Sequence, residues 1–121
     1  MKVAYVGGPY RADTVHEIAA NIRAAESYAV ELWKEGWAVI CPYATGASQN
    51  SAFLDGAVPD ETFLAGDLEL LARCDVLVLI DGWRDSKGAL SERDHAYKLG
   101  IPVYDWRLHR ELLSRGARTI P

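Results

Sequence analysis

A serine, a glycine and a glutamate follow one another in the stretch Ser86-x-Gly88-x-x-x-Glu92, with a spacing that suits the binding of an anion. Ser86 is a typical helix N-cap residue, and the backbone N–H groups after Gly88 would lie at a helix N-terminus, where anions bind readily. Glu92 would lie near the start of the same helix, beside the pocket. Alone, Ser86 is an ordinary cap and Glu92 an ordinary solvated residue, so the prediction depends on what else converges there.

A second group of candidates follows the first apolar run of the chain, in the turn Gly7-Gly8-Pro9-Tyr10-Arg11. Glycines let the backbone approach a ligand closely, although many α/β proteins have such a turn for geometry alone. The guanidinium of Arg11 could add a fork of hydrogen-bond donors to the same anion.

Asp67 interrupts an apolar helical stripe. It lies four residues after Phe63 and four before Leu71, so it shares their helix face. A carboxylate on a buried face is costly unless it has a partner or a task. We expect a functional Asp67 slightly more than a buried cap or a residue at the edge of the face.

The elements that must position these residues can be read from hydrophobic periodicity and from start and stop signals. The first helix starts at the capping box Thr14-Val-His-Glu17 and ends at Gly36; Pro59 opens another helix. Continuous apolar runs are typical of strands buried on both faces of a parallel sheet. The predicted strands are 2–6, 37–41, 76–80 and 101–104; the predicted helices are 14–36, one from 59, 86–100 and a last one at 107–115 with Leu108 and Leu112 on one face.

Alternating strands and helices predict a single α/β domain over 1–121, with a tail at about 115–121. We expect a flavodoxin- or Rossmann-like parallel sheet of order 2-1-3-4, with room for a fifth short strand and helices on both faces. The topological switch point would then bring the turn 7–11 and the loop 82–88 together across one crevice. The residues expected there are Tyr5, Gly8, Tyr10, Arg11, Asp67, Asp81, Ser86, Gly88 and Glu92.

Composition narrows the classes of partner. A formal net charge of −4 argues against a nucleic-acid polymer, which would require a basic patch. Cys41 and Cys74 have no CxxC spacing and no neighbouring histidines, so we expect reduced thiols in a cytoplasmic protein, and neither a metal nor a cofactor. No stretch fits a membrane segment. For the long loop 43–58 we expect a lid over the site or a plain surface loop, with equal weight. Gln49 and Asn50 in this loop could form hydrogen bonds with the edge of a base.

Three separate segments together resemble the nucleoside 2-deoxyribosyltransferase superfamily. They are Tyr5-x-x-Gly8-x-x-Arg11, Asp67-Leu-Glu-x-Leu-x-x-Cys-Asp75 and Ser86-x-Gly88-x-x-x-Glu92-x-x-x-Ala96. The resemblance implies that Glu92 is a nucleophile that attacks the anomeric carbon of a sugar, that Asp67 assists departure of the base or holds the sugar, and that Tyr5 hydrogen-bonds the nucleophile.

The same resemblance indicates a branch of the superfamily. Ser86, where nucleoside transferases tend to have an acid, together with Arg11, is similar to the branch that hydrolyses nucleoside 5′-monophosphates, in which these residues hold the phosphate. Asp94 departs from the family, since many members have glycine there; it either crowds the pocket or faces solvent.

The chemistry fits this interpretation, because a carboxylate beneath a sugar stabilises an oxocarbenium-like state and can trap it covalently. Burial could raise the pKa of Asp67 so that it protonates the departing base. The function expected is therefore N-glycosidic cleavage of a (deoxy)nucleoside 5′-monophosphate through a glycosyl-Glu92 intermediate, with release of the base.

Other interpretations remain open. One is a deoxyribosyltransferase that uses a free base as acceptor, and another is a nucleotide-binding module without turnover. A phosphoribohydrolase of the lysine-decarboxylase-like group ranks low, because its Gly-Gly-x-Gly-Thr signature is missing. The resemblance also implies a homodimer or higher homo-oligomer, for which Trp33, Trp37 and Trp106 are interface or core candidates.

Overall fold

The computed structural model describes residues 1–42, 56 and 58–116 of the 121-residue chain. The loop predicted at 43–58, with Gln49 and Asn50, therefore lies almost wholly outside the described residues, as does most of the predicted tail. The described elements are β1 (Val3–Gly7), α1 (Val15–Lys34), β2 (Ala38–Ile40), α4 (Asp60–Ala72), β3 (Val76–Leu79), the 3₁₀ helix η1 (Trp83–Asp85), α5 (Lys87–Leu99), β4 (Val103–Asp105) and α6 (Arg110–Ser114).

The described strands form one parallel sheet in the order β2-β1-β3-β4, which confirms the predicted fold class and strand order. In the register of the sheet, Tyr5 pairs with Ile40 on one side and with Leu77 on the other. All of β3 is buried, as its continuous apolar run predicted. Since β1 connects to β2 on one side and lies against β3 on the other, the switch point falls between β1 and β3.

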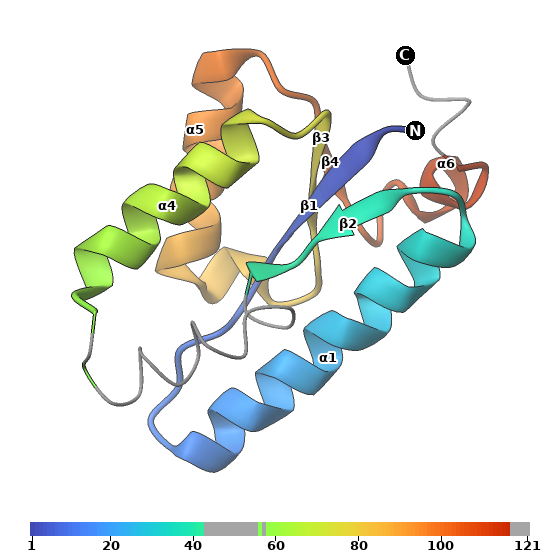
Figure 1. The fold of residues 1–121 in the computed structure, drawn as a ribbon. Coiled ribbons are helices and arrows are strands. Elements are labelled where there is room, and N and C mark those ends of the chain that lie inside the picture. The colour runs from blue at the N-terminus through green and yellow to red at the C-terminus, as the bar shows by residue number, and fades with distance from the viewer. Residues whose placement is uncertain (43–55, 57, 117–121) are drawn as a thin grey trace.

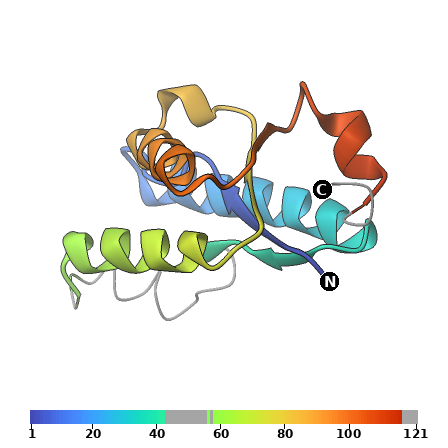
Figure 2. The ribbon, with the colours of Figure 1, turned by 90° about the horizontal axis from the view of Figure 1, so that it is seen from above.

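Helices cover both faces of this sheet (Figure 1). The connection from β1 to β2 leads toward one edge of the sheet, whereas the connections that reach β3 and β4 lead toward the other edge. Because such connections are right-handed, α1 lies on one face of the sheet and α4 and α5 lie on the other. Seen from above, α1 passes behind β1 (Figure 2). One core cluster joins α1 and α6 to the sheet through Leu32, Trp37 and Leu113, and the other joins α4 and α5 through Tyr5, Leu71 and Ala96.

The long helix α1 begins as predicted, because the Thr14 side chain accepts a hydrogen bond of 3.1 Å from the Glu17 backbone N–H. Its buried face consists of Ile18, Ala25, Ala29 and Leu32. Val15 and Trp33, near the two ends of the helix, are exposed. None of the described helices combines the length and the apolar character needed to cross a membrane.

The last helix is shorter than predicted. Its expected start at residue 107 is wrong because the Asp105 carboxylate accepts hydrogen bonds from the backbone N–H groups of Arg107 (2.9 Å) and Leu108 (3.1 Å), which hold this segment in a turn. The helix therefore begins at Arg110, and Leu112, predicted to lie on its apolar face, packs partly buried against the core. Leu113 is fully buried, whereas Leu108, predicted to lie on the apolar face, is exposed.

Candidate functional site

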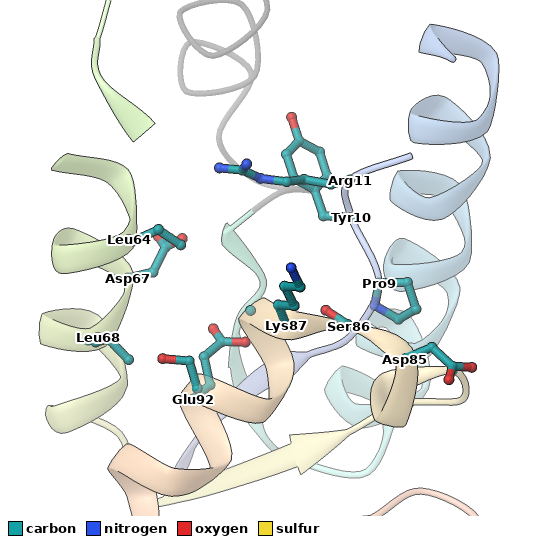
Figure 3. Close-up of a pocket in the computed structure, with 13 residues that line it drawn as sticks. Pro9, Tyr10, Arg11, Leu64, Asp67, Leu68, Asp85, Ser86, Lys87 and Glu92 are labelled. Atoms are coloured by element: carbon teal, nitrogen blue, oxygen red, sulfur yellow. The ribbon is translucent and has the colours of Figure 1, made fainter. Parts of the chain in front are cut away.

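A cavity of about 730 Å³ opens at the carboxyl ends of β1 and β3, where the switch point was predicted to place a site (Figure 3). Its volume is within the range typical of small-molecule sites. In the described part of the chain, three segments form it: the turn after β1, helix α4, and the stretch from the end of β3 into α5. The described lining residues are Pro9, Tyr10, Arg11, Leu64, Asp67, Leu68, Gly82, Asp85, Ser86, Lys87, Gly88, Ser91 and Glu92.

Glu92 lies on α5 with its carboxyl group at the cavity and is only 4% exposed. It approaches the end of β1, where a Cβ atom added to Gly7 would lie 3.1 Å from Glu92 Oε1. A side chain at Gly7 would thus crowd the carboxyl group. Gly7 was not among the predicted site residues; strand alternation, which places it on the same face as Tyr5, was the signal that could have found it.

The electrostatic state of Glu92 is unusual for a carboxyl group. Burial is the largest influence and, together with the negative charge of Asp67, raises the pKa of Glu92 to about 8, against the opposing effect of the Tyr5 hydroxyl. Within the described part of the chain, neither Glu92 oxygen makes a hydrogen bond of ordinary geometry. The carboxyl group therefore holds a proton at neutral pH and has hydrogen-bonding capacity to offer a ligand.

Asp67 lies on α4, and both Asp67 and Glu92 point into the cavity (Figure 3). It is 5% exposed, which confirms the burial predicted from its place in the apolar stripe. On the same helix, Leu64 and Leu68 give the cavity an apolar wall, while Leu71 packs in the core. Two acids from neighbouring helices are thus buried in one apolar surrounding, and the charge of one raises the pKa of the other.

Ser86 caps α5, as its sequence position predicted. Its Oγ accepts a hydrogen bond of 3.2 Å from the Ala89 N–H and donates a long one of 3.5 Å to the Gly8 carbonyl oxygen. Ser86 and Gly88 both line the cavity, at the N-terminus of a helix that has no acidic residue in its first turn. Between them, Lys87 points its ammonium group into the cavity (Figure 3). Sequence reasoning missed Lys87, although a cation at a helix N-terminus goes against the helix dipole and was a usable signal.

Arg11 and Tyr10 lie on the far side of the cavity from Glu92 (Figure 3). Arg11 forms an ion pair of 2.9 Å with Asp60 at the start of α4, and both side chains are about half exposed. Tyr10 is buried, which raises the pKa of its hydroxyl against the opposing charge of Arg11. Its backbone carbonyl oxygen accepts a hydrogen bond of 3.1 Å from the Asn21 side chain, which ties the turn to α1.

The predicted site residues that remain are placed differently. Tyr5 is fully buried beneath the cavity, where its hydroxyl lowers the pKa of Glu92. Gly8 is required by packing, since a Cβ there would overlap Cγ1 of the Ile80 side chain. Asp81 was predicted to bind substrate, but the structure places it outside the cavity lining, where it pairs with Arg107 at 3.1 Å.

Asp94 faces away from the cavity. It is exposed, and its carboxylate accepts hydrogen bonds from the neighbouring Arg93 side chain at 3.1 and 3.3 Å. Of the two placements considered for Asp94, the structure shows the solvent-facing one, so this departure from the family pattern does not crowd the pocket.

In the described residues, no three His, Cys, Asp or Glu side chains gather closely enough to hold a metal ion. A comparison with curated proteins finds no match to the chain. A family model described as a domain of unknown function, DUF4406, matches residues 4–105. That segment runs from β1 through β4 and includes every described residue that lines the cavity. Because the match spans most of its length, the chain belongs to the DUF4406 family.

Proposed function

We propose that this protein is an N-glycosidase that cleaves the bond between sugar and base in a (deoxy)nucleoside 5′-monophosphate and releases the free base. The observation that carries the proposal is the buried pair of acids, Asp67 and Glu92, in a cavity that the N-terminus of α5 also lines. The resemblance of three segments to the nucleoside 2-deoxyribosyltransferase superfamily supports the same assignment.

The charge state of the pair suits this chemistry. Cleavage of an N-glycosidic bond needs a carboxylate for the anomeric carbon and a proton for the departing base. With the pKa of Glu92 at about 8, the cavity at neutral pH already holds a proton that is poorly solvated and available for transfer. We propose that this proton passes to the base through Asp67, which leaves Glu92 ionised at the moment that it is needed as the nucleophile.

The reaction then proceeds in two displacements. In the first, a Glu92 carboxylate oxygen forms a bond to the anomeric carbon while the C–N bond breaks, its electron pair remaining on the base nitrogen, which takes the proton. In the second, a water oxygen attacks the anomeric carbon, the ester C–O bond breaks to restore the Glu92 carboxylate, and Asp67 accepts the proton of the water. The products are a free base and a sugar 5-phosphate.

A base-exchange assay tests the proposal. The protein is incubated with ribo- and deoxynucleosides and their 5′-monophosphates, with and without a free acceptor base, and the released base is followed by chromatography. We expect release from monophosphates without an acceptor and at least a 10³-fold lower rate in Glu92→Gln, since the nucleophile is removed. Glu26→Gln, a change of an exposed acid on α1, is the matched control.

Other outcomes of this assay decide against the proposal. Exchange that requires both a nucleoside and an acceptor base would identify a deoxyribosyltransferase, which forms the same intermediate but gives it to a base instead of water. Binding without turnover would identify a nucleotide-binding module. Full activity in Glu92→Gln would remove the nucleophile assignment.

We also propose that the protein acts in the cytoplasm as a homo-oligomer. The two cysteines, Cys41 and Cys74, are both free and buried, which suits a reducing compartment. Of the tryptophans considered for an interface, Trp37 is fully buried in the core, whereas Trp33 is 52% exposed beside the equally exposed Val30 on α1. A mass measurement in solution that gives only the monomer would contradict the oligomer.

A further inference from the structure

Two of the described residues that line the cavity are cations, and the structure gives them different surroundings. Arg11 is held at 2.9 Å by the Asp60 carboxylate, so an incoming anion would have to compete with Asp60 for it. Lys87 is exposed, points its ammonium group into the cavity (Figure 3) and forms no ion pair with any residue that the structure describes. An anion could therefore reach Lys87 without displacing any carboxylate of the described residues.

The cavity needs such a cation if its ligand is an anion. Asp67 and Glu92 are both buried in its wall; burial, and to a lesser extent the repulsion by the charge of Asp67, raises the pKa of Glu92. A phosphate that entered without a compensating positive charge would meet the same repulsion. Lys87 supplies that charge beside the Ser86 hydroxyl and the backbone N–H groups of the first turn of α5.

The positions along α5 separate the two functions of the cavity. Lys87 begins the helix and Glu92 lies five residues later, roughly 7.5 Å along the helix axis at 1.5 Å per residue. One ligand that extends along this helix can thus present an anionic group to the first turn and a reacting carbon to Glu92. The buried Glu92 carboxyl, which lacks a hydrogen bond of ordinary geometry in the described residues, is an independent sign that a ligand completes this site.

We propose that Lys87 is the specificity-determining residue of the cavity: it binds the dianionic phosphate of a sugar 5-phosphate unit, with Ser86 beside it, while Arg11 stays paired with Asp60. This proposal rests on the function proposed above, because it assumes that the sugar lies over Glu92. It differs from the interpretation of the sequence, which assigned the phosphate to Ser86 and Arg11.

Titration calorimetry with 2-deoxyribose 5-phosphate and with 2-deoxyribose tests the proposal without turnover. Loss of a charge-assisted contact predicts that Lys87→Met raises the Kd of the sugar phosphate roughly 10- to 100-fold and leaves that of the unphosphorylated sugar unchanged. Lys87→Arg should retain most of the affinity. Lys98→Met, at the other end of the same helix and outside the cavity lining, is the matched control and should bind like the wild type.

Three results would overturn the assignment of Lys87: unchanged affinity in Lys87→Met, a larger loss in Arg11→Met than in Lys87→Met, or a wild-type protein that does not bind the sugar phosphate. Failure of the proposed reaction has a different signature. A wild type that binds the sugar phosphate through Lys87 but releases no base from any nucleotide would leave the assignment intact and refute the N-glycosidase. Base release from monophosphates with the same KM in Lys87→Met as in the wild type would support the N-glycosidase and refute the assignment of Lys87.

Discussion

Replacement of Glu92 by glutamine should make the protein more stable, increasingly so as the pH rises. The pKa of Glu92 is 4.5 in an unperturbed chain and about 8 in the folded protein, mainly because of burial. Between these two values the folded state keeps a proton that the unfolded state has released, so the free energy of unfolding falls as the pH increases. Below pH 4.5 both states are protonated and the cost vanishes.

The size of the effect follows from the same two values. A difference of 3.5 pKa units between 4.5 and 8, at 1.36 kcal/mol per unit, corresponds to a loss on the order of 5 kcal/mol over the full window. About 3 kcal/mol of this loss is already present at pH 7, because the unfolded chain is then fully ionised at this position while the folded protein is still largely protonated. Such a loss is a large fraction of the stability of a small domain.

Urea unfolding of the wild type and of Glu92→Gln at pH 5, 7 and 9 measures this directly. Titrating groups other than the coupled Asp67 affect both proteins equally, so the difference between the two free energies of unfolding isolates Glu92 together with its interaction with Asp67. It should shift by several kcal/mol in favour of the variant from pH 5 to pH 9, whereas the difference for the exposed Glu26→Gln should stay constant. A constant difference for Glu92→Gln as well would refute the view that this carboxyl group is buried and unfavourably ionised.

Further substitutions probe the surroundings of the site. Gly7→Ala should lower the free energy of unfolding by roughly 1–3 kcal/mol in urea titrations, because its Cβ would meet Glu92 Oε1 at 3.1 Å and Leu77 and Leu79 at 3.3 Å. Gly66→Ala on α4, where the added carbon meets nothing within 4 Å, should instead raise it by about 0.5–1 kcal/mol. Asp105→Ala should lower the free energy of unfolding by roughly 2 kcal/mol at pH 7. Burial alone would raise the pKa of Asp105, but the hydrogen bonds from Trp83 and from two backbone N–H groups outweigh burial and lower that pKa. The stabilisation by Asp105 is therefore present above the pKa of the unfolded chain and is lost as the pH falls through the pKa of the folded protein. Equal losses at pH 7 and pH 2 would contradict this. Asp94→Asn should change the affinity for 2-deoxyribose 5-phosphate less than twofold, since Asp94 faces away from the cavity.

The fold was predictable because its determinants are local. The continuous apolar run that became β3 and the capping box at Thr14 each indicated one element, and connection rules reduced their assembly to one strand order. The end of the chain was less predictable. There the Asp105 side chain competes with helix formation by binding two backbone N–H groups, and periodicity contains no sign of such a competition.

The site was predictable where a residue broke a pattern. Asp67 was found because a carboxylate interrupted an apolar stripe, and Ser86 because a cap precedes a helix. Asp81 was predicted to lie in the site because it continues the pattern of the strand before it. Strand alternation would direct it to the face of α4 and α5, but β3 ends at Leu79 and the turn that follows brings Asp81 to Arg107 instead. Lys87 was missed because its one local signal, a cation at a helix N-terminus, does not by itself show that the side chain enters a cavity.

The burial of Glu92 lowers stability at neutral pH, and the proposed function gives a reason for keeping an acid there. A glutamine would fill the same space without the cost of ionisation, so the requirements of folding alone do not explain an acid at this position. The strand beneath it is shaped around that acid: Tyr5 places a hydroxyl near the carboxyl group, and Gly7, on the same face, leaves room for it. A destabilising acid with a raised pKa, a neighbouring acid and a cavity in front of it is the combination expected when a group is kept for chemistry at the expense of stability.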